Sequence, residues 1–167
     1  MATVLTETLS ANTAITFDLS SLGASATFVA GRECTQITGA GEVDAIVNVK
    51  GITGSASTAT AGQGINIYAW GADTSLATTA IDTLVGTDAA RTIALPTLQS
   101  LRFIARAYTT VTTASQVYYF MPFSIAQQFG GVMPKFWGLF VATDLTGGLA
   151  AAMSAKFSFN GITYTNT

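Results

Sequence analysis

The chain of 167 residues combines 49% hydrophobic residues and a mean hydropathy of +0.46 with only 10% charged residues and a net charge of −2. Ordinary soluble domains carry roughly 25% charged residues, so much of this surface must be Thr, Ser, Ala, Gly and exposed apolar atoms. Such a surface excludes little by itself, but it favours association with other subunits over life as a free monomer.

The residue inventory excludes several classes of protein. With no histidine and a single cysteine, Cys34, the chain has no Ser-His machinery, no zinc site and no intrachain disulfide. Its seven basic residues are scattered, which argues against nucleic-acid binding and polybasic membrane attachment. Polar residues interrupt every apolar run before about 18 residues, so no membrane span is predicted. The first residues lack the pattern of a secretory signal, so we expect synthesis in a cytoplasm, where thiols stay reduced.

An N-terminal arm is predicted over residues 1–12, which are polar and rich in Thr, ahead of a single domain over residues 13–167. An ordinary frayed terminus is the alternative reading of the same residues.

Strand patterns dominate the rest of the chain. Period-two alternation and β-branched residues predict strands at 13–19, 24–30, 42–50, 64–70, 101–108, 117–120, 136–142 and 155–165. In the strand over 101–108, Phe103 and Ala105 are expected to face inward with Leu101 and Ala107. The Asn160-Gly161 pair fits either a hairpin turn or a bulge within one terminal strand.

The connections carry weaker signals. Residues 51–62, rich in Gly, Ser and Thr, predict a mobile surface loop. Residues 73–100 could hold one further strand or a short helix. Ser124 as N-cap, followed at Gly130 by a glycine pair, predicts one or two helical turns.

These elements predict an all-β fold with at most one or two short helices. An antiparallel β-sandwich with a jelly roll of about eight strands is the preferred architecture, ahead of an immunoglobulin-like sandwich. Cys34 is expected to be a small buried hydrophobe.

Two chemistries survive the inventory. Nine acidic residues could supply a carboxylate pair for glycoside hydrolysis, but their spacing singles out no pair. Asp73, Asp82 and Asp88 fall in one long loop and could hold a structural Ca²⁺, although Asp also favours turns. We therefore expect no catalytic residue and no cofactor.

An aromatic block occupies residues 118–140, where eight aromatic side chains gather. Strand alternation turns about half of them inward, and the others need cover from another subunit. The predicted partner-binding residues, including two from the arm, are Val4, Leu5, Tyr118, Tyr119, Phe120, Met133, Phe136 and Trp137. The alternative function is a carbohydrate-binding module that stacks sugars on exposed Trp70, Tyr68 or Trp137.

The C-terminal half contains Tyr119-Phe-Met-Pro-Phe-Ser-Ile-Ala, then Phe129-Gly-Gly-Val-Met-Pro-Lys-Phe-Trp-Gly-Leu-Phe-Val-Ala, and finally Gly161-Ile-Thr-Tyr-Thr. These segments resemble a family of small virion structural proteins of tailed bacteriophages. Ala69-Trp-Gly-Ala-Asp-Thr-Ser-Leu-Ala-Thr-Thr-Ala-Ile-Asp82 and Val29-Ala-Gly-Arg-Glu33 are similar to the same group.

The resemblance implies a non-enzymatic decoration or cement protein on the exterior of the capsid. Members of this group are often trimers and often jelly rolls, so the expected partners are the major capsid protein and further copies of this chain. Its expected location is the capsid surface of the virion. A head-fibre or tail component is a further alternative.

Overall fold

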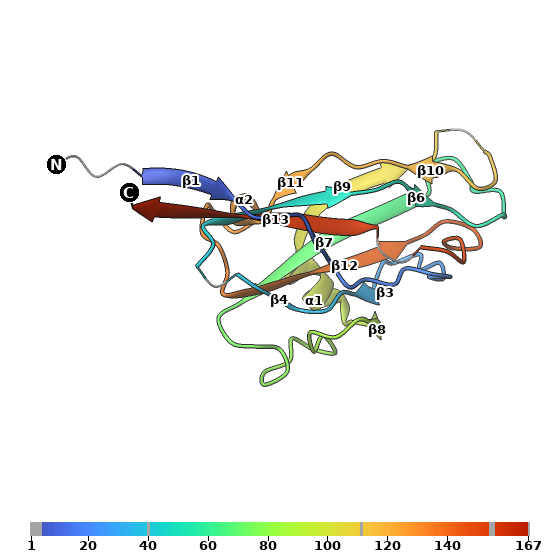
Figure 1. Cartoon of the computed structure of the whole chain (residues 1–167). Helices are drawn as coiled ribbons and strands as arrows, with labels where there is room; N and C mark the ends of the chain where they lie inside the picture. The colour runs from blue at the N-terminus through green and yellow to red at the C-terminus, as the bar shows by residue number, and fades with distance from the viewer. Residues whose placement is uncertain (1–4, 40, 111, 154–155, 167) are drawn as a thin grey trace.

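Two antiparallel sheets face each other in the computed structural model, which describes residues 5–39, 41–110, 112–153 and 156–166 (Figure 1). The first, called the β13 sheet, has the strand order β1 (Leu5–Leu9), β13 (Phe157–Asn166), β5 (Asp44–Val49) and β11 (Phe123–Ser124), with β2 (Thr13–Ala14) also paired to β13. The second, called the β12 sheet, has the order β8 (Ala89–Thr92), β3 (Ala30–Glu33), β12 (Phe136–Thr143), β7 (Gly64–Ala72) and β9 (Arg102–Tyr108), with β4 (Ile37–Thr38) also paired to β12.

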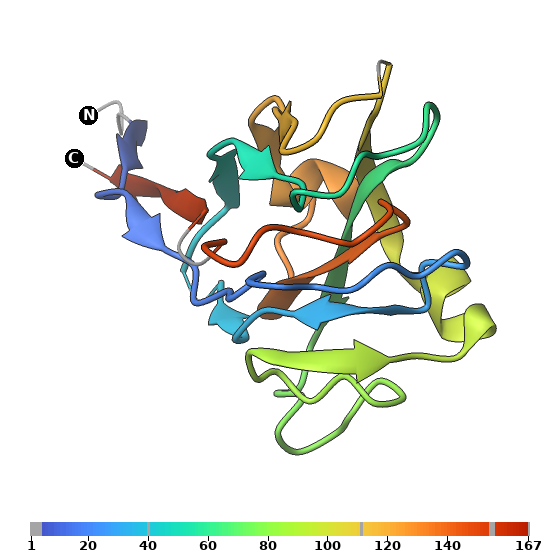
Figure 2. The ribbon, with the colours of Figure 1, turned by 90° about the vertical axis from the view of Figure 1, so that its right-hand side faces the viewer.

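This architecture is the predicted antiparallel β-sandwich (Figure 2). Eight strands of the described chain have four residues or more, and five further strands have only two. Two of these short strands, β6 (Ile52–Thr53) and β10 (Val117–Tyr118), pair only with each other. The arrangement is compatible with a jelly roll, and that finer assignment stays a prediction.

The main core lies between the two sheets because each contributes one face of alternating apolar side chains. From the β13 sheet come buried residues of β5 and β13, and from the β12 sheet come Trp137, Leu139, Ile65 and Ile67 with their neighbours. Cys34 is part of this core, as predicted, and its Sγ accepts a hydrogen bond from the Leu139 N–H at 3.0 Å. Burial raises the pKa of Cys34 to about 12, so the thiol stays protonated and inert.

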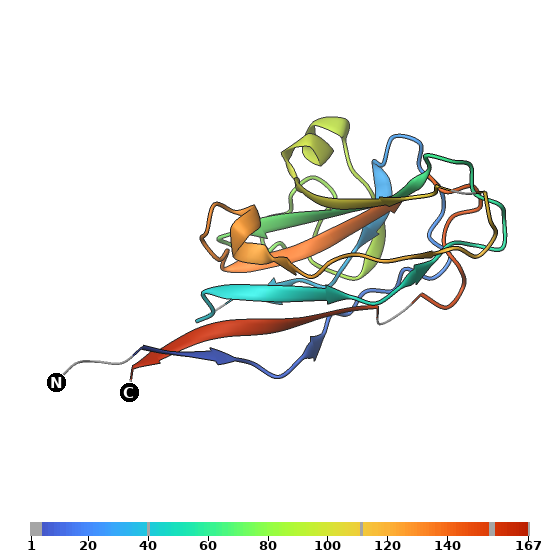
Figure 3. The ribbon, with the colours of Figure 1, turned by 90° about the horizontal axis from the view of Figure 1, so that it is seen from above.

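A second apolar layer covers the outer face of the β12 sheet. Residues 73–101 contain both elements between which the sequence left a choice, strand β8 and helix α1 (Leu95–Ser100). Five apolar side chains of residues 73–101 pack on Tyr68, Trp70 and Phe140 of the sheet. They are Leu76, Leu84, Ile93, Leu98 and Leu101. Figure 3 shows α1 outside the sheet. Strand β7 is therefore buried on both faces from Gly64 to Trp70.

Two ion pairs fasten this outer layer to β3. The Glu33 carboxylate, with no exposed side-chain surface, accepts from Arg91 Nε at 3.0 Å and from the Val85 and Gly86 N–H groups at 3.2 and 2.7 Å. Arg32, the residue before Glu33 in β3, forms the second ion pair, with its Nε 2.6 Å from Asp88 Oδ1. The long connection is thus held by buried charge as well as by apolar packing.

Three predicted elements differ from the structure. Residues 13–19 alternate as predicted, with Ile15, Phe17 and Leu19 buried, but only β2 is a strand because the chain crosses here between the sheets. The Ile15 N–H bonds to the β13 sheet, and the Thr16 carbonyl accepts from Thr35 on the other side. Within 24–30, a turn with Phe28 at φ 59° delays the strand until Ala30. Residues 51–62 are no free loop, since Ile52 is fully buried in β6.

The terminal strand and the short helix have clear local explanations. Strand β13 pairs with β5 in unbroken register through Asn160-Gly161, so the hairpin alternative is wrong. Helix α2 (Ile125–Gln128) begins as predicted at Ser124, whose Oγ accepts from the Gln127 N–H at 3.0 Å. It ends where Gly130 and Gly131 take φ values of 74° and 88°.

A β-bulge in β9 reverses the predicted orientation of Phe103, and Leu101, also expected to face inward, is buried in the second apolar layer on the outer face. Tyr68 pairs with Phe103 and Ile67 with Ala105, so Ile104 is an additional residue in β9. Phe103 is therefore 53% exposed instead of facing inward, while Ile104 packs against the main core.

Candidate interaction surfaces

Both ends of the described chain form a two-stranded ribbon that projects from the sandwich (Figures 1 and 3). This terminal ribbon consists of β1 and residues 162–166 of β13, with Leu5 opposite Asn166 and Leu9 opposite Ile162. Every residue of β1 is exposed. Residues 5–9 of the predicted arm are thus a paired strand, and Val4 lies outside the described residues.

The terminal ribbon has two different faces. Residues directly opposite each other in an antiparallel pair share a face. One face is apolar, with Leu5 67%, Leu9 58% and Tyr164 52% exposed, and it also carries Glu7 and Ile162. The other face consists of four threonines: Thr6, Thr8, Thr163 and Thr165. Sandwich packing cannot account for the apolar face, because it lies opposite the side on which Phe157 and Phe159 enter the core.

Strand β1 is the last strand of its sheet, and no strand of the described residues pairs with its outer edge. Natural edge strands are usually protected by Lys, Pro, a bulge or a covering loop. Strand β1 contains neither Lys nor Pro, and Glu7 is its one charged residue. The ribbon therefore presents an apolar face on a strand that ends its sheet.

Glu42 lies at the base of the ribbon, packed against Gly161. Its Oε2 is buried without a hydrogen-bond partner in the described structure, and burial raises the pKa of this carboxyl above its ordinary value of 4.5. A raised folded-state pKa means that ionised Glu42 opposes folding, and that this cost disappears as the pH falls through that pKa.

We expect Glu42→Gln to raise the free energy of unfolding at pH 7 by roughly 1 kcal/mol or less, because solvent screens this half-buried site. Urea unfolding of both proteins at several pH values measures the difference. The gain should shrink towards zero below the ordinary carboxyl range, where wild-type Glu42 is protonated as well. A gain that is constant with pH would contradict this account. The pKa of Asp18, lowered first by its side-chain hydrogen bond with Ser20, affects both proteins equally.

A groove opens on the side of the sandwich where the edges of the two sheets approach. It is lined by Ile104, Ala105 and Arg106 of β9 and by residues 119–123 and Gln128, and its volume is about 330 Å³. We call it the β9 groove. Tyr119 and Met121 on its wall are 75% and 82% exposed, and Phe120 is half-buried.

The predicted partner-binding residues do not form one site. Tyr118 is buried, with its hydroxyl 2.6 Å from Thr109 Oγ1, and Trp137 is buried edge-on to Phe159. Both side chains belong to the main core. Tyr119 and Phe120 line the β9 groove, whereas Leu5 lies on the terminal ribbon.

The two remaining predicted residues, Met133 and Phe136, lie just before β12 and at its first position. Met133 is half-buried in a separate hollow of about 250 Å³ with Phe129, Val132 and Pro134. Phe136 is half-buried beneath the Lys135 ammonium, 5.5 Å from its ring centre.

The exposed apolar residues that the sequence did not single out include Leu9, Phe103, Met121 and Tyr164. Leu9 and Tyr164 could have been found, because Leu5-Thr-Glu-Thr-Leu9 and Ile162-Thr-Tyr164 alternate as a two-faced strand does. Phe103 had no such signal, since its exposure depends on the bulge.

The aromatic residues required for carbohydrate stacking are buried. Trp70 is 2%, Tyr68 8% and Trp137 0% exposed. The prediction that they are exposed is wrong, because strands β7 and β12 are covered on both faces. None of the three offers a ring face to a sugar.

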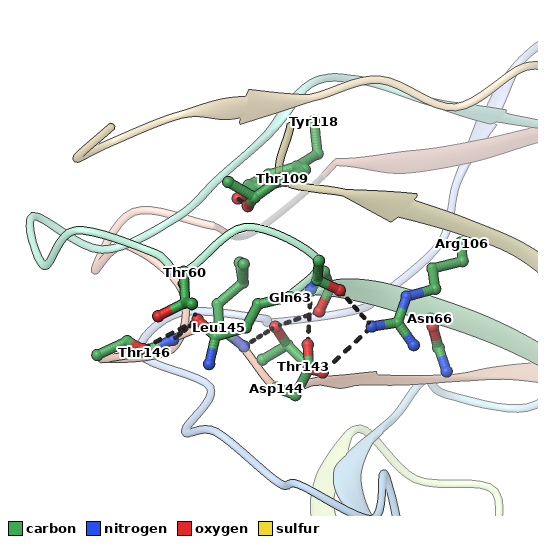
Figure 4. Close-up of polar contacts among 12 residues, drawn as sticks. Thr60, Gln63, Asn66, Arg106, Thr109, Tyr118, Thr143, Asp144, Leu145 and Thr146 are labelled. Atoms are coloured by element: carbon green, nitrogen blue, oxygen red, sulfur yellow. Dashed lines mark hydrogen bonds and ion pairs between the residues drawn. The ribbon is translucent and has the colours of Figure 1, made fainter. Parts of the chain in front are cut away.

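A polar cluster ties together the ends of β7, β9 and β12 (Figure 4). Gln63 Oε1 accepts from Thr60 N–H and from the backbone and hydroxyl of Thr146. Asp144 accepts from the Gly64 N–H at 2.6 Å and from Arg106 at 3.1 Å. The polar groups of the cluster are hydrogen-bonded to one another, and the bonds join segments that are far apart in sequence. We therefore assign the cluster a structural role.

The three aspartates considered for calcium are used separately. Asp88 pairs with Arg32, Asp82 accepts from the Ala94 N–H at 2.6 Å, and Asp73 is exposed beside the hollow that contains Met133. Within the described residues, no three His, Cys, Asp or Glu side chains gather as a metal site would require. The same part of the chain has no helix with the length and apolar character that a membrane crossing needs.

Comparison with known proteins gives no relative from which a function could be inferred. No family model matches the chain, and no curated protein or solved structure is significantly similar to it.

Proposed function

We propose that this chain is a non-enzymatic structural protein of a bacteriophage virion, which stabilises the capsid exterior by binding across neighbouring subunits as an oligomer. The observation that carries the proposal is the terminal ribbon, whose apolar face projects away from the sandwich. A protein that works alone gains nothing from such a projection, whereas a subunit of an assembly buries it.

The remaining surface supports the same proposal. The β9 groove adds exposed Tyr119 and Met121, residue types enriched at interface centres. Burial of apolar surface stabilises a complex by about 25 cal/mol per Å², less the cost of association. Because so few charges are available, such binding depends little on ionic strength. The sequence resemblance is the reason for proposing the capsid as the surface that is bound.

The proposal is tested by producing the chain together with the major capsid protein of the same genome and sedimenting the assembled shells. We expect the chain to sediment with the shells in nearly equal amounts at low and moderate salt. Replacing both ribbon leucines, Leu5→Ser with Leu9→Ser, should reduce its occupancy at least about tenfold, since each substitution removes roughly 1.5–3 kcal/mol of buried apolar contact. Thr8→Ser with Thr163→Ser on the other face is the matched control. Chain that stays in the supernatant, or that leaves the shells as salt rises, would contradict the proposal.

A further inference from the structure

The chain presents two surfaces with exposed apolar residues that complement each other, the apolar face of the terminal ribbon and the β9 groove. The ribbon lies at one edge of the sandwich, because β1 ends the β13 sheet. The groove lies at the opposite side, beside β9 at the end of the β12 sheet and the segment leading into β11 at the end of the β13 sheet. One copy cannot bring these two edges together, but two copies placed side by side can.

Their apolar residues match in kind. The ribbon offers Leu5, Leu9 and Tyr164, all more than half exposed. The groove offers Tyr119 and Met121 on one wall and Ile104 and Ala105 on the other. An extended strand with alternating side chains suits a groove that runs beside a free sheet edge.

Their charges match in sign. Glu7, between Leu5 and Leu9, is the one charged residue of the described ribbon, and no ion pair of the described structure includes it. Arg102 is an exposed residue of β9 that is likewise free of ion pairs there. Its register partner is Ala69, a residue of the main core, so Arg102 lies on the inner side of β9, as Ala105 does. Arg106 is already engaged, since it pairs with Asp144 and donates to the Gly62 carbonyl.

The ribbon charge also disfavours the simplest alternative. Two β1 strands that paired antiparallel about their centre would place the two Glu7 carboxylates opposite each other, and like charges in that position are destabilising. A head-to-tail contact avoids this repulsion. Contacts of that kind generate closed rings when the rotation closes.

We infer that the terminal ribbon of one copy docks in the β9 groove of the next, with Glu7 facing Arg102, and that this contact builds the oligomer. The inference deepens the proposed function by naming its self-association surface. It concerns the chain alone and does not require that the capsid proposal holds.

The test is native mass spectrometry and sedimentation velocity of the purified full chain. We expect the wild type to be oligomeric, and Glu7→Arg or Arg102→Glu alone to weaken association about tenfold or more, because each brings like charges together across the contact. The double variant with both substitutions should restore the oligomer. Lys135→Glu, at an exposed cation outside the groove, is the matched control and should leave the mass unchanged.

Thermal unfolding of each variant shows whether it is folded, as expected for substitutions at exposed positions. A wild type that is monomeric at every concentration would overturn the inference. An oligomer that survives both single charge reversals would overturn it as well. Because no capsid protein is present, failure here differs visibly from failure of the shell-binding experiment.

Discussion

Glu33→Ala is expected to lower the free energy of unfolding by about 3–5 kcal/mol, the usual cost of removing one partner from a buried ion pair. The carboxylate has no exposed surface and satisfies three donors at once, from Arg91, Val85 and Gly86. Its removal leaves the Arg91 guanidinium and two backbone N–H groups without their acceptor. Since these donors belong to the covering segment 73–101, the outer layer of the β12 sheet should loosen first.

Urea unfolding measures this difference, and hydrogen exchange locates it. Glu33→Gln keeps the shape and one acceptor oxygen, so its loss should be smaller. Asp73→Ala, at an exposed carboxylate of the same covering segment, is the matched control and should stay within about 0.5 kcal/mol of the wild type. A Glu33→Ala protein as stable as that control would show that the buried pair does not hold the covering segment.

Gly138→Ala is expected to destabilise the chain by about 1–3 kcal/mol through overpacking. Gly138 pairs with Trp70 across strands β12 and β7. A Cβ at this position would lie 2.6 Å from Cε2 and 3.0 Å from Nε1 of the indole. Trp70 is 2% exposed and enclosed by the second apolar layer, so the ring has no free space into which it can move.

Gly23→Ala is the matched control, because a Cβ there meets nothing within 4 Å. The thermal unfolding midpoint should fall for Gly138→Ala and remain unchanged for Gly23→Ala. The tryptophan emission of the folded Gly138→Ala protein should also shift, since its added methyl group displaces the indole. An unchanged midpoint and spectrum would mean that the Trp70 packing described here is wrong.

Local patterns in the sequence predicted those strands and helices whose formation depends on neighbouring residues. The alternation in 42–50 and 64–70 located β5 and β7, and Ser124 with Gly130 located helix α2. Tyr118 and Tyr119 point to opposite sides, one buried and one exposed, as alternation within the aromatic block requires.

Features that depend on distant residues were not predictable in the same way. Nothing in 73–101 indicates that these residues cover Trp70 and Phe140, because that contact joins segments separated in sequence. The exposure of Phe103 follows from one additional residue in β9, which no periodicity reveals. The terminal ribbon required both chain ends, which lie at opposite extremes of the sequence.

The central claim, that this chain stabilises a capsid from outside, is tested most directly by electron cryomicroscopy of particles purified from cells that produce the chain and the capsid protein together. We predict density for the β-sandwich on the outer surface, in contact with more than one capsid subunit and with neighbouring copies joined through the terminal ribbon. Particles without this density, or a chain located only in the tail or fibres, would contradict the claim.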